Sequence, residues 1–171
     1  AFLPGNMAGV EAAVFYLLAY SITLLSAFGI ITMLSTRKKD ADDVEIYRGL
    51  FWKKPLMALV LTIALLSLAG IPLTAGFIAK FYVLGAGIQS QLVLPVIVLV
   101  VTSVIGLYYY LRVISVMFAA PVPAEDWEKT VSPLFYNSTY IALVILALAL
   151  VALGVFPGLV VEDIRTLLTV R

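Results

Sequence analysis

Four long apolar segments, separated by shorter polar stretches, dominate the hydrophobic pattern. They run from about 9 to 35, 56 to 87, 95 to 118 and 134 to 156. Each is long enough to cross about 30 Å of hydrocarbon as a helix that rises about 1.5 Å per residue. The pattern therefore predicts an all-α integral membrane helix bundle with four transmembrane helices, forming a single membrane domain over residues 1–171.

The second segment is too long for one straight membrane helix. Residues 56–87 would extend about 48 Å as a continuous helix, about half as much again as the hydrocarbon core. Gly70, Pro72 and Gly76 weaken a helix near its middle, and backbone groups freed there need partners inside a membrane. We expect two half-helices separated near residues 70–74. A simple kink with close helix packing is the alternative.

Most of the charged residues lie in the connections between the segments. Residues 36–54 contain six Lys or Arg residues, the connection near Gln89 and Gln91 has no charge, and the third connection contains Lys129. Because Lys and Arg favour cytoplasmic loops, the first and third connections are predicted to be cytoplasmic. Residues 42–52 are interpreted as a solvated loop with aromatic anchors, and a short interfacial helix is the alternative.

The two ends of the chain carry weaker signals. Apolar and charged residues alternate over 159–171 at a spacing that suits an amphipathic surface helix. A frayed terminus is the alternative. The chain begins with Ala1 and shows no charged stretch before a short apolar core. No signal peptide is therefore expected, and a processed chain and a fragment are both open.

Composition supports a membrane protein and excludes several kinds of site. Hydrophobic residues make up 63% of the chain, charged residues 12%, and the mean hydropathy is +1.11; the charged fraction is about half that of soluble proteins. The net charge of +1 gives no indication of nucleic-acid binding. The chain has no cysteine and no histidine, so we expect no haem, zinc or iron–sulfur centre, and neither cofactor-binding nor metal-binding residues.

Lys80 is the main candidate functional residue. It lies nine residues before Gln89, or about 13 Å along a helix, which places it near the middle of the membrane. A lysine at that depth is costly and is commonly functional, whereas a lysine that snorkels from a helix end is the alternative. Because burial disfavours the charged form of an amine, Lys80 is a candidate for accepting and releasing protons.

The sequence offers Lys80 no obvious partner. Glu11, near the start of the first segment, is the one acidic residue within the four segments. A buried ammonium without a partner is strongly disfavoured. We therefore expect the counter-charge of Lys80 to lie on another chain or on additional sequence, or to be replaced by water.

Other polar residues have two interpretations each. Glu11 most simply caps the first helix; a proton path or a subunit contact is the alternative. The group of Tyr108, Tyr109, Tyr110 and Arg112 is typical of an interfacial belt, or it lines a hydrated path. Ordinary interhelical hydrogen bonding is expected of four residues in the first segment, which are Tyr20, Ser21, Thr23 and Ser26.

The stretch around the expected break resembles a known family. Ser67-Leu68-Ala69-Gly70-Ile71-Pro72, followed by Gly76-Phe77-Ile78-Ala79-Lys80-Phe81-Tyr82, is similar to the antiporter-like membrane subunits of NADH–quinone oxidoreductase, respiratory complex I. Further stretches support the resemblance, at residues 15–17, 27–29, 47–52 and 105–112. Together they cover nearly the whole chain in the order that the family shows.

The resemblance implies the C-terminal portion of such a subunit, in redox-driven proton translocation across a bacterial inner membrane. By position in the motif, Lys80 takes the role of the family's proton-transferring residue on the broken helix. NADH, FMN, iron–sulfur clusters and quinone are then expected in partner subunits. The expected partners are other membrane subunits, the rest of the same subunit and lipid, without nucleic acid. The alternatives are a multi-subunit sodium/proton antiporter, a membrane-bound hydrogenase, or a non-catalytic membrane scaffold.

Overall fold

Helices account for all the regular structure in the part of the chain that the computed structural model describes, which is residues 7–35, 43–121 and 133–169. The predicted all-α fold is confirmed. In chain order the helices are α1 (Met7–Leu34), the short 3-10 helix η1 (Val44–Tyr47), α2 (Leu50–Lys53), α3 (Pro55–Ala69), α4 (Ala75–Gln89), α5 (Val93–Phe118), α6 (Pro133–Val155) and α7 (Pro157–Thr169).

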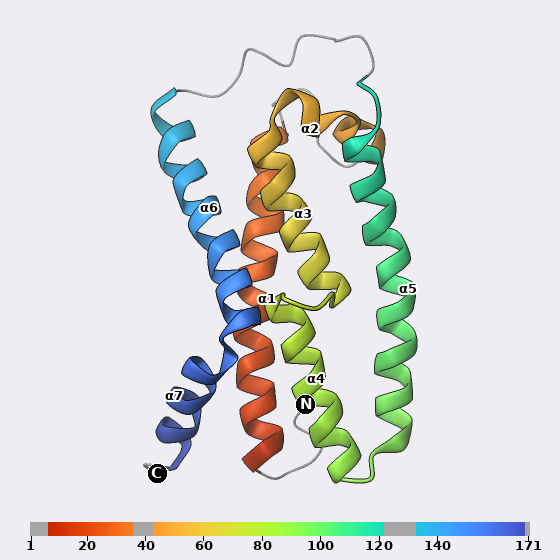
Figure 1. Cartoon of the computed structure of the whole chain (residues 1–171), viewed down its shortest axis with the longest axis vertical. Helices are drawn as coiled ribbons and strands as arrows, with labels where there is room; N and C mark the ends of the chain where they lie inside the picture. The colour runs from red at the N-terminus through yellow and green to blue at the C-terminus, as the bar shows by residue number, and fades with distance from the viewer. Residues whose placement is uncertain (1–6, 36–42, 122–132, 170–171) are drawn as a thin grey trace.

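The long helices stand side by side, with α1 at the centre of the bundle. α1 runs the full height of the molecule, and α3 and α4 follow one another beside it (Figure 1). α1 packs against both of these helices and against α6, and α5 packs against α3 and α4. α1 is therefore the element to which both halves of the discontinuous segment are attached.

Length and apolarity identify two of the described helices as membrane spans on their own. These are the stretches Gly9–Leu34 and Val93–Phe118, each of 26 residues. α3 and α4 have 15 residues each, or about 22 Å, so neither crosses about 30 Å of hydrocarbon alone. They do so in series, as the predicted discontinuous second segment. α6 has 23 residues, and it meets α7 at a bend of 81°.

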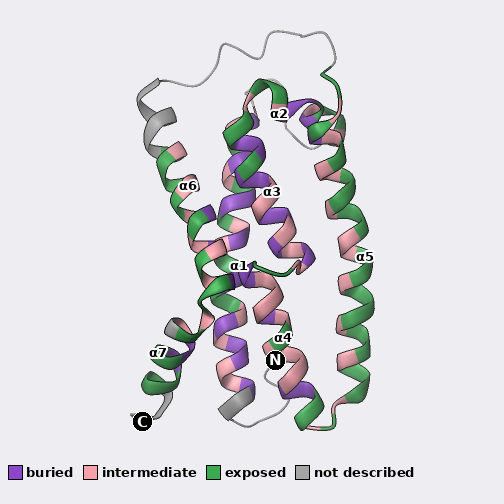
Figure 2. Ribbon diagram, in the orientation of Figure 1, coloured by how far each residue is buried: buried purple, intermediate pink, exposed green. Residues whose placement is uncertain are grey.

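The core lies between α1, α3 and α6. Phe15, Ile30, Met57, Leu61 and Leu150 are fully enclosed there, and the buried residues line the inner sides of α1 and α3 (Figure 2). α5 differs, because its apolar side chains lie mostly on the surface (Figure 2). Apolar exposure along a whole helix suits contact with lipid tails or with other membrane helices rather than with water.

The first connection is more ordered than a solvated loop. Tyr47 and Leu50 are buried, the ring of Phe51 stacks on that of Phe118 at 4.6 Å, and the N–H of Gly49 donates to the carbonyl of Val116 at 3.2 Å. The solvated-loop interpretation is therefore wrong for residues 43–53, and the short-helix alternative is closer. Residues 36–42, Lys129 and residues 170–171 lie outside the described ranges. That the first and third connections face the cytoplasm stays a prediction.

Candidate functional site

The first half of the broken segment ends in a Schellman motif. Gly70 adopts a left-handed conformation, with φ 79°. Its N–H donates to the carbonyl of Ser67 at 3.0 Å, and the N–H of Ile71 donates to that of Leu66, also at 3.0 Å. This motif pairs two of the four carbonyls that a helix C-terminus leaves free. The carbonyls of Leu68 and Ala69 are left for another donor.

Lys80 supplies that donor from the other half of the segment. Its Nζ donates to the carbonyl of Leu68 at 2.8 Å and to that of Ala69 at 3.3 Å. The last turn of a helix carries partial negative charge, so an ammonium is favoured there. A Cβ on Gly70 would lie 3.2 Å from this Nζ, which shows how closely the side chain crosses the break. The structure thus places the amine at the break and does not support snorkelling to the headgroups.

The start of α4 is tied to the end of α3 as well. The N–H of Gly76 donates to the Oγ of Ser67 at 3.0 Å, so Ser67 serves as a cap for a helix that begins eight residues later. Thr23 donates to the carbonyl of Ala19 at 2.6 Å, and its Oγ1 lies 3.2 Å from the Oγ of Ser67. Because Thr23 has one hydroxyl proton and gives it to Ala19, Ser67 is the donor in the second bond.

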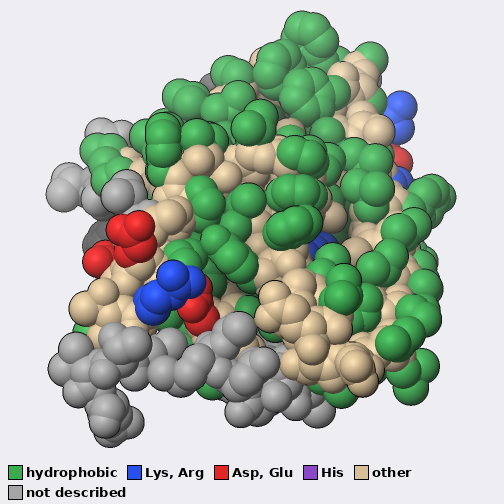
Figure 3. Space-filling model, turned by 60° about the horizontal axis from the view of Figure 1, so that its bottom comes forward, with side chains coloured by type: hydrophobic (Ala, Val, Ile, Leu, Met, Phe, Trp, Pro, Cys, Tyr) green, Lys and Arg blue, Asp and Glu red, His purple; other side chains and the backbone are tan. Residues whose placement is uncertain are grey.

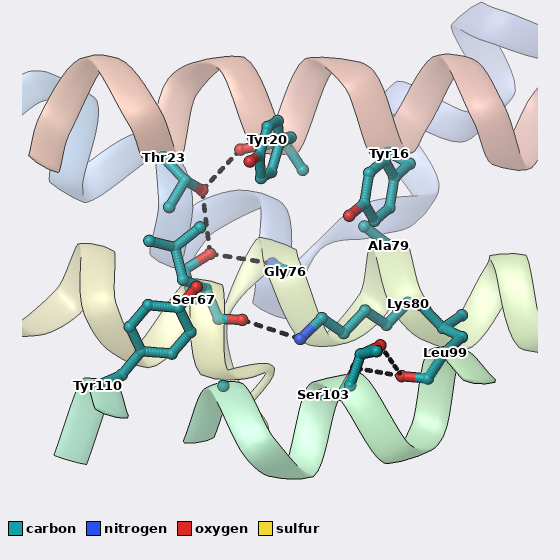
Figure 4. A pocket seen from close by; sticks show the side chains of 14 residues that line it. Tyr16, Tyr20, Thr23, Ser67, Gly76, Ala79, Lys80, Leu99, Ser103 and Tyr110 are labelled. Atoms are coloured by element: carbon teal, nitrogen blue, oxygen red, sulfur yellow. Dashed lines mark hydrogen bonds between the residues drawn. The ribbon is translucent and has the colours of Figure 1, made fainter. Parts of the chain in front are cut away.

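The resulting chain of hydrogen bonds runs from α4 through α3 to α1 (Figure 4). It fixes both ends of the break to α1, so the carbonyls that hold Lys80 have a defined position. Of the predicted break residues, Gly70 ends α3, Pro72 lies in the irregular stretch of residues 70–74, and Gly76 lies in the first turn of α4. The chain also confirms the expected interhelical bond of Thr23.

A cavity of about 210 Å³ opens beside the Lys80 amine. It is large enough for several water molecules, since each occupies about 30 Å³ in the liquid. Figure 4 shows Tyr16 and Tyr20 entering from α1 and Tyr110 from α5. Its polar lining comes from α1, α3, α4 and α5 and comprises Tyr16, Tyr20, Thr23, Ser67, Lys80, Thr102, Ser103 and Tyr110. This combination of an amine, hydroxyl groups and space suits proton exchange with water.

Some of the candidate residues lie elsewhere. The side chains of Tyr108 and Tyr109 are exposed, at 64% and 58%, and neither they nor Arg112 line the Lys80 cavity. Tyr110, on the adjacent position of the same helix, lines it. The sequence spacing could have indicated that Tyr110 faces the cavity, because residues 99, 102, 103, 106 and 110 share one face of a helix.

Glu11 pairs with the opposite end of the chain. α1 begins at Met7 and has no acidic residue in its first turn, so the interpretation of Glu11 as a helix cap is wrong. Its Oε1 accepts from the Nη2 of Arg165 in α7 at 3.1 Å, and its Oε2 accepts from the Nε at 3.3 Å. These hydrogen bonds, together with the charge of Glu11, raise the pKa of Arg165 further above its ordinary value.

The pair lies at the end of the bundle where α7 turns away. In an oblique view of that end, hydrophobic side chains cover much of the surface and charged side chains are few (Figure 3). Val161 and Ile164 of α7 are buried, whereas Glu162 and Asp163 are exposed. α7 is therefore amphipathic, and the ion pair adds a polar attachment to the apolar one that Val161 and Ile164 provide.

Replacing Glu11 by Gln is expected to loosen α7, because the neutral amide loses the ionic part of the attachment. We expect amide hydrogen exchange over residues 157–169 to become about two- to fivefold faster. The effect is modest because a partly exposed ion pair contributes little to stability. Asp163→Asn is the matched control, since it removes an exposed carboxylate from the same helix and leaves the pair of Glu11 and Arg165 in place. Equal exchange rates in the two variants, measured by mass spectrometry of the assembled protein, would contradict the prediction.

Comparison with known proteins shows the family to which the chain belongs. The sequence model of the family described as "NADH:quinone oxidoreductase/Mrp antiporter, TM" matches residues 1–106. The chain belongs to this family. A chain of respiratory complex I from Thermus thermophilus, in a structure with bound aureothin, is similar to it at 32% identity and a TM-score of 0.76. The similarity covers 89% of this chain and 34% of the Thermus chain, so the present chain spans about a third of that subunit.

The part of the chain that matches the NADH:quinone oxidoreductase/Mrp antiporter family includes the break and Lys80. Residues 67–82 fall within the matched range, whereas α6 and α7 lie beyond it. Within residues 7–35, 43–121 and 133–169, no group of three or more His, Cys, Asp or Glu residues is arranged to hold a metal ion. The polar groups that the site presents are the amine of Lys80, the hydroxyls of its lining and backbone carbonyls.

Proposed function

We propose that this chain is the C-terminal portion of subunit N of a bacterial NADH–quinone oxidoreductase, and that Lys80 carries protons during redox-driven translocation. The observation that supports the proposal most is the position of the Lys80 amine. It bonds to the carbonyls of Leu68 and Ala69 and lines a polar cavity at the break of a membrane helix. Discontinuous helices present backbone groups to ions in many transporters.

The geometry allows the amine to change its protonation state without leaving its place. Two carbonyls take two N–H groups, which both the ammonium and the neutral amine possess. The ammonium then has a third N–H to donate towards the cavity, and the amine has a lone pair there to accept a proton. Lys80 makes no ion pair with a carboxylate among the described residues, so a nearby charge on other sequence could shift its protonation.

Translocation is a property of the whole assembly in this proposal. The rest of the subunit, other membrane subunits and lipid surround the bundle in the bacterial inner membrane. NADH, FMN, iron–sulfur clusters and quinone belong to partner subunits, and the first and third connections face the cytoplasm. Exposure of apolar side chains along α5 supports such neighbours, because an apolar surface of this extent suits lipid tails or other membrane helices rather than water.

A second function is favoured by the family description, which also names the Mrp antiporter. In a multi-subunit sodium/proton antiporter, the same lysine would exchange its proton in response to sodium rather than to electron transfer. Membrane-bound hydrogenases share the motif and form a related alternative. In each of these assemblies Lys80 performs the same acid–base step, and the energy source differs.

Proton movement in vesicles that contain the complete assembly tests the proposal. We expect translocation to require NADH and quinone and to continue in sodium-free buffer. Proton movement that follows an imposed sodium gradient without NADH would instead establish the antiporter alternative. A non-catalytic scaffold would leave translocation unchanged when Lys80 is replaced.

A further inference from the structure

The hydroxyl groups around Lys80 fall into two classes. The serine and threonine hydroxyls give their protons to the protein. Thr102 donates to the carbonyl of Val98 at 2.8 Å, Ser103 donates to that of Leu99 at 2.7 Å, and Thr23 and Ser67 belong to the chain that holds the break. A hydroxyl whose only proton is already bonded to a carbonyl is a poor relay, because it must first break that bond.

The three tyrosines are in the other class. Tyr16 and Tyr20 lie on α1, with their rings stacked at 5.8 Å, and Tyr110 lies on α5. Their hydroxyls make no hydrogen bond to another described residue. No buried side-chain nitrogen or oxygen of the half-buried and buried residues in the described ranges lacks a partner, so the hydroxyls of Tyr16 and Tyr110 are not sealed inside the protein, and Tyr20 is 42% exposed. They are open to the space beside Lys80.

A glycine gives Tyr110 its direction. A helical side chain leans over the turn that precedes it, and that turn contains Gly106. A Cβ on Gly106 would lie 3.3 Å from Cε2 of Tyr110, so the ring lies along the helix surface that this glycine leaves bare. Both residues line the cavity. The tyrosine is therefore aimed along α5 towards the break, whereas Tyr108 and Tyr109 face outwards.

We propose that Tyr16, Tyr20 and Tyr110 form, with the water of this cavity, the relay through which Lys80 exchanges its proton. The inference rests on the proposed role of Lys80 and names the groups that act next to it. In each transfer a tyrosine oxygen accepts a proton from one neighbour while its own proton passes to the next. One proton is moved, each tyrosine begins and ends neutral, and no oxidant or reductant is needed.

Tyr110→Phe in the assembled complex tests the relay. The ring and its packing remain while the hydroxyl is lost. We expect proton translocation to fall about tenfold, less than the ~100-fold or more of a direct acid–base group, because water can partly replace the hydroxyl. The ratio of rates in H2O and D2O should also rise, since proton transfer then limits the reaction. A packing defect alone would leave that ratio unchanged.

Tyr109→Phe is the matched control, because it removes the hydroxyl from an exposed residue beside Tyr110. Rates are compared per amount of assembled complex. A variant in which Tyr16, Tyr20 and Tyr110 are all replaced by Phe should lose more translocation activity than Tyr110→Phe. Equal rates and equal isotope ratios in Tyr110→Phe and Tyr109→Phe would overturn the relay. If the relay is overturned in this way but Lys80→Met fails to translocate protons, the proposed role of Lys80 remains supported. Normal translocation in Lys80→Met would remove the proposed function itself.

Discussion

Replacing Lys80 by Met in the full assembly is expected to reduce NADH-driven proton translocation by about 100-fold, the size of effect typical of a positioned acid–base group. Methionine has a similar length but no N–H groups, so it cannot carry a proton. The carbonyls of Leu68 and Ala69 lose their donor, which costs about 1–3 kcal/mol unless water in the cavity takes its place. The complex should therefore still assemble, and proton release by vesicles is the measurement.

Two further variants separate proton transfer from structural capping. Lys80→Arg keeps a positive charge and several N–H groups for the two carbonyls, but a guanidinium does not lose its proton in proteins. We expect it to assemble well and to translocate poorly. Lys53→Met is the charge control, because Lys53 is an exposed lysine in α2. Normal translocation by Lys80→Arg would show that the lysine only caps α3.

Replacing Gly76 by Ala is expected to destabilise the fold strongly, although it adds only one methyl group. A Cβ there would overlap the carbonyl oxygen of Ser67 and lie 2.7 Å from the carbonyl carbon. Backbone cannot rotate aside as a side chain can, and Ser67 is held by Thr23 as well. Relief requires α4 to move away from α3, which breaks the bond between Gly76 and Ser67. We expect a cost of about 3 kcal/mol, at the upper end for overpacking.

Gly85→Ala provides the control within the same helix. A Cβ on Gly85 meets no atom within 4 Å, and an alanine in a helix is more favourable than a glycine by roughly 0.5–1 kcal/mol. We expect Gly85→Ala to assemble normally and Gly76→Ala to lower both the yield of the complex and its thermal unfolding temperature in detergent. Similar unfolding temperatures for the two variants would show that the close approach at Gly76 carries no stability.

The break and its lysine could be predicted because their signals are local. A helix of 32 residues is too long for the membrane, and Gly70 and Pro72 mark where it must stop. What could not be predicted was the partner of Lys80. The sequence indicates that a break frees carbonyls around residues 67–70, but it does not show that those of Leu68 and Ala69 bind the amine. Which carbonyls a Schellman motif leaves free depends on how the chain turns after the helix.

The functions of individual polar residues were harder to assign. Tyr108, Tyr109 and Tyr110 look alike in the sequence, yet of these three only Tyr110 lines the cavity. Successive residues of a helix point in directions about 100° apart. The rotation of α5 about its axis is set by packing against α3 and α4. Glu11 was assigned to its own helix, whereas its partner Arg165 is 154 residues away. Charge along the chain does not reveal such a pairing.

The sequence by itself determined the membrane environment, the order of the long helices and the interruption of the second segment. Each of these follows from hydrophobic length and from the backbone preferences of glycine and proline, which act over a few residues. The tertiary structure decided which carbonyls hold the amine, which hydroxyls surround it and which helix α7 is attached to. These depend on how helices rotate and pack against one another, and only folding brings residues so far apart in the chain within a few ångströms.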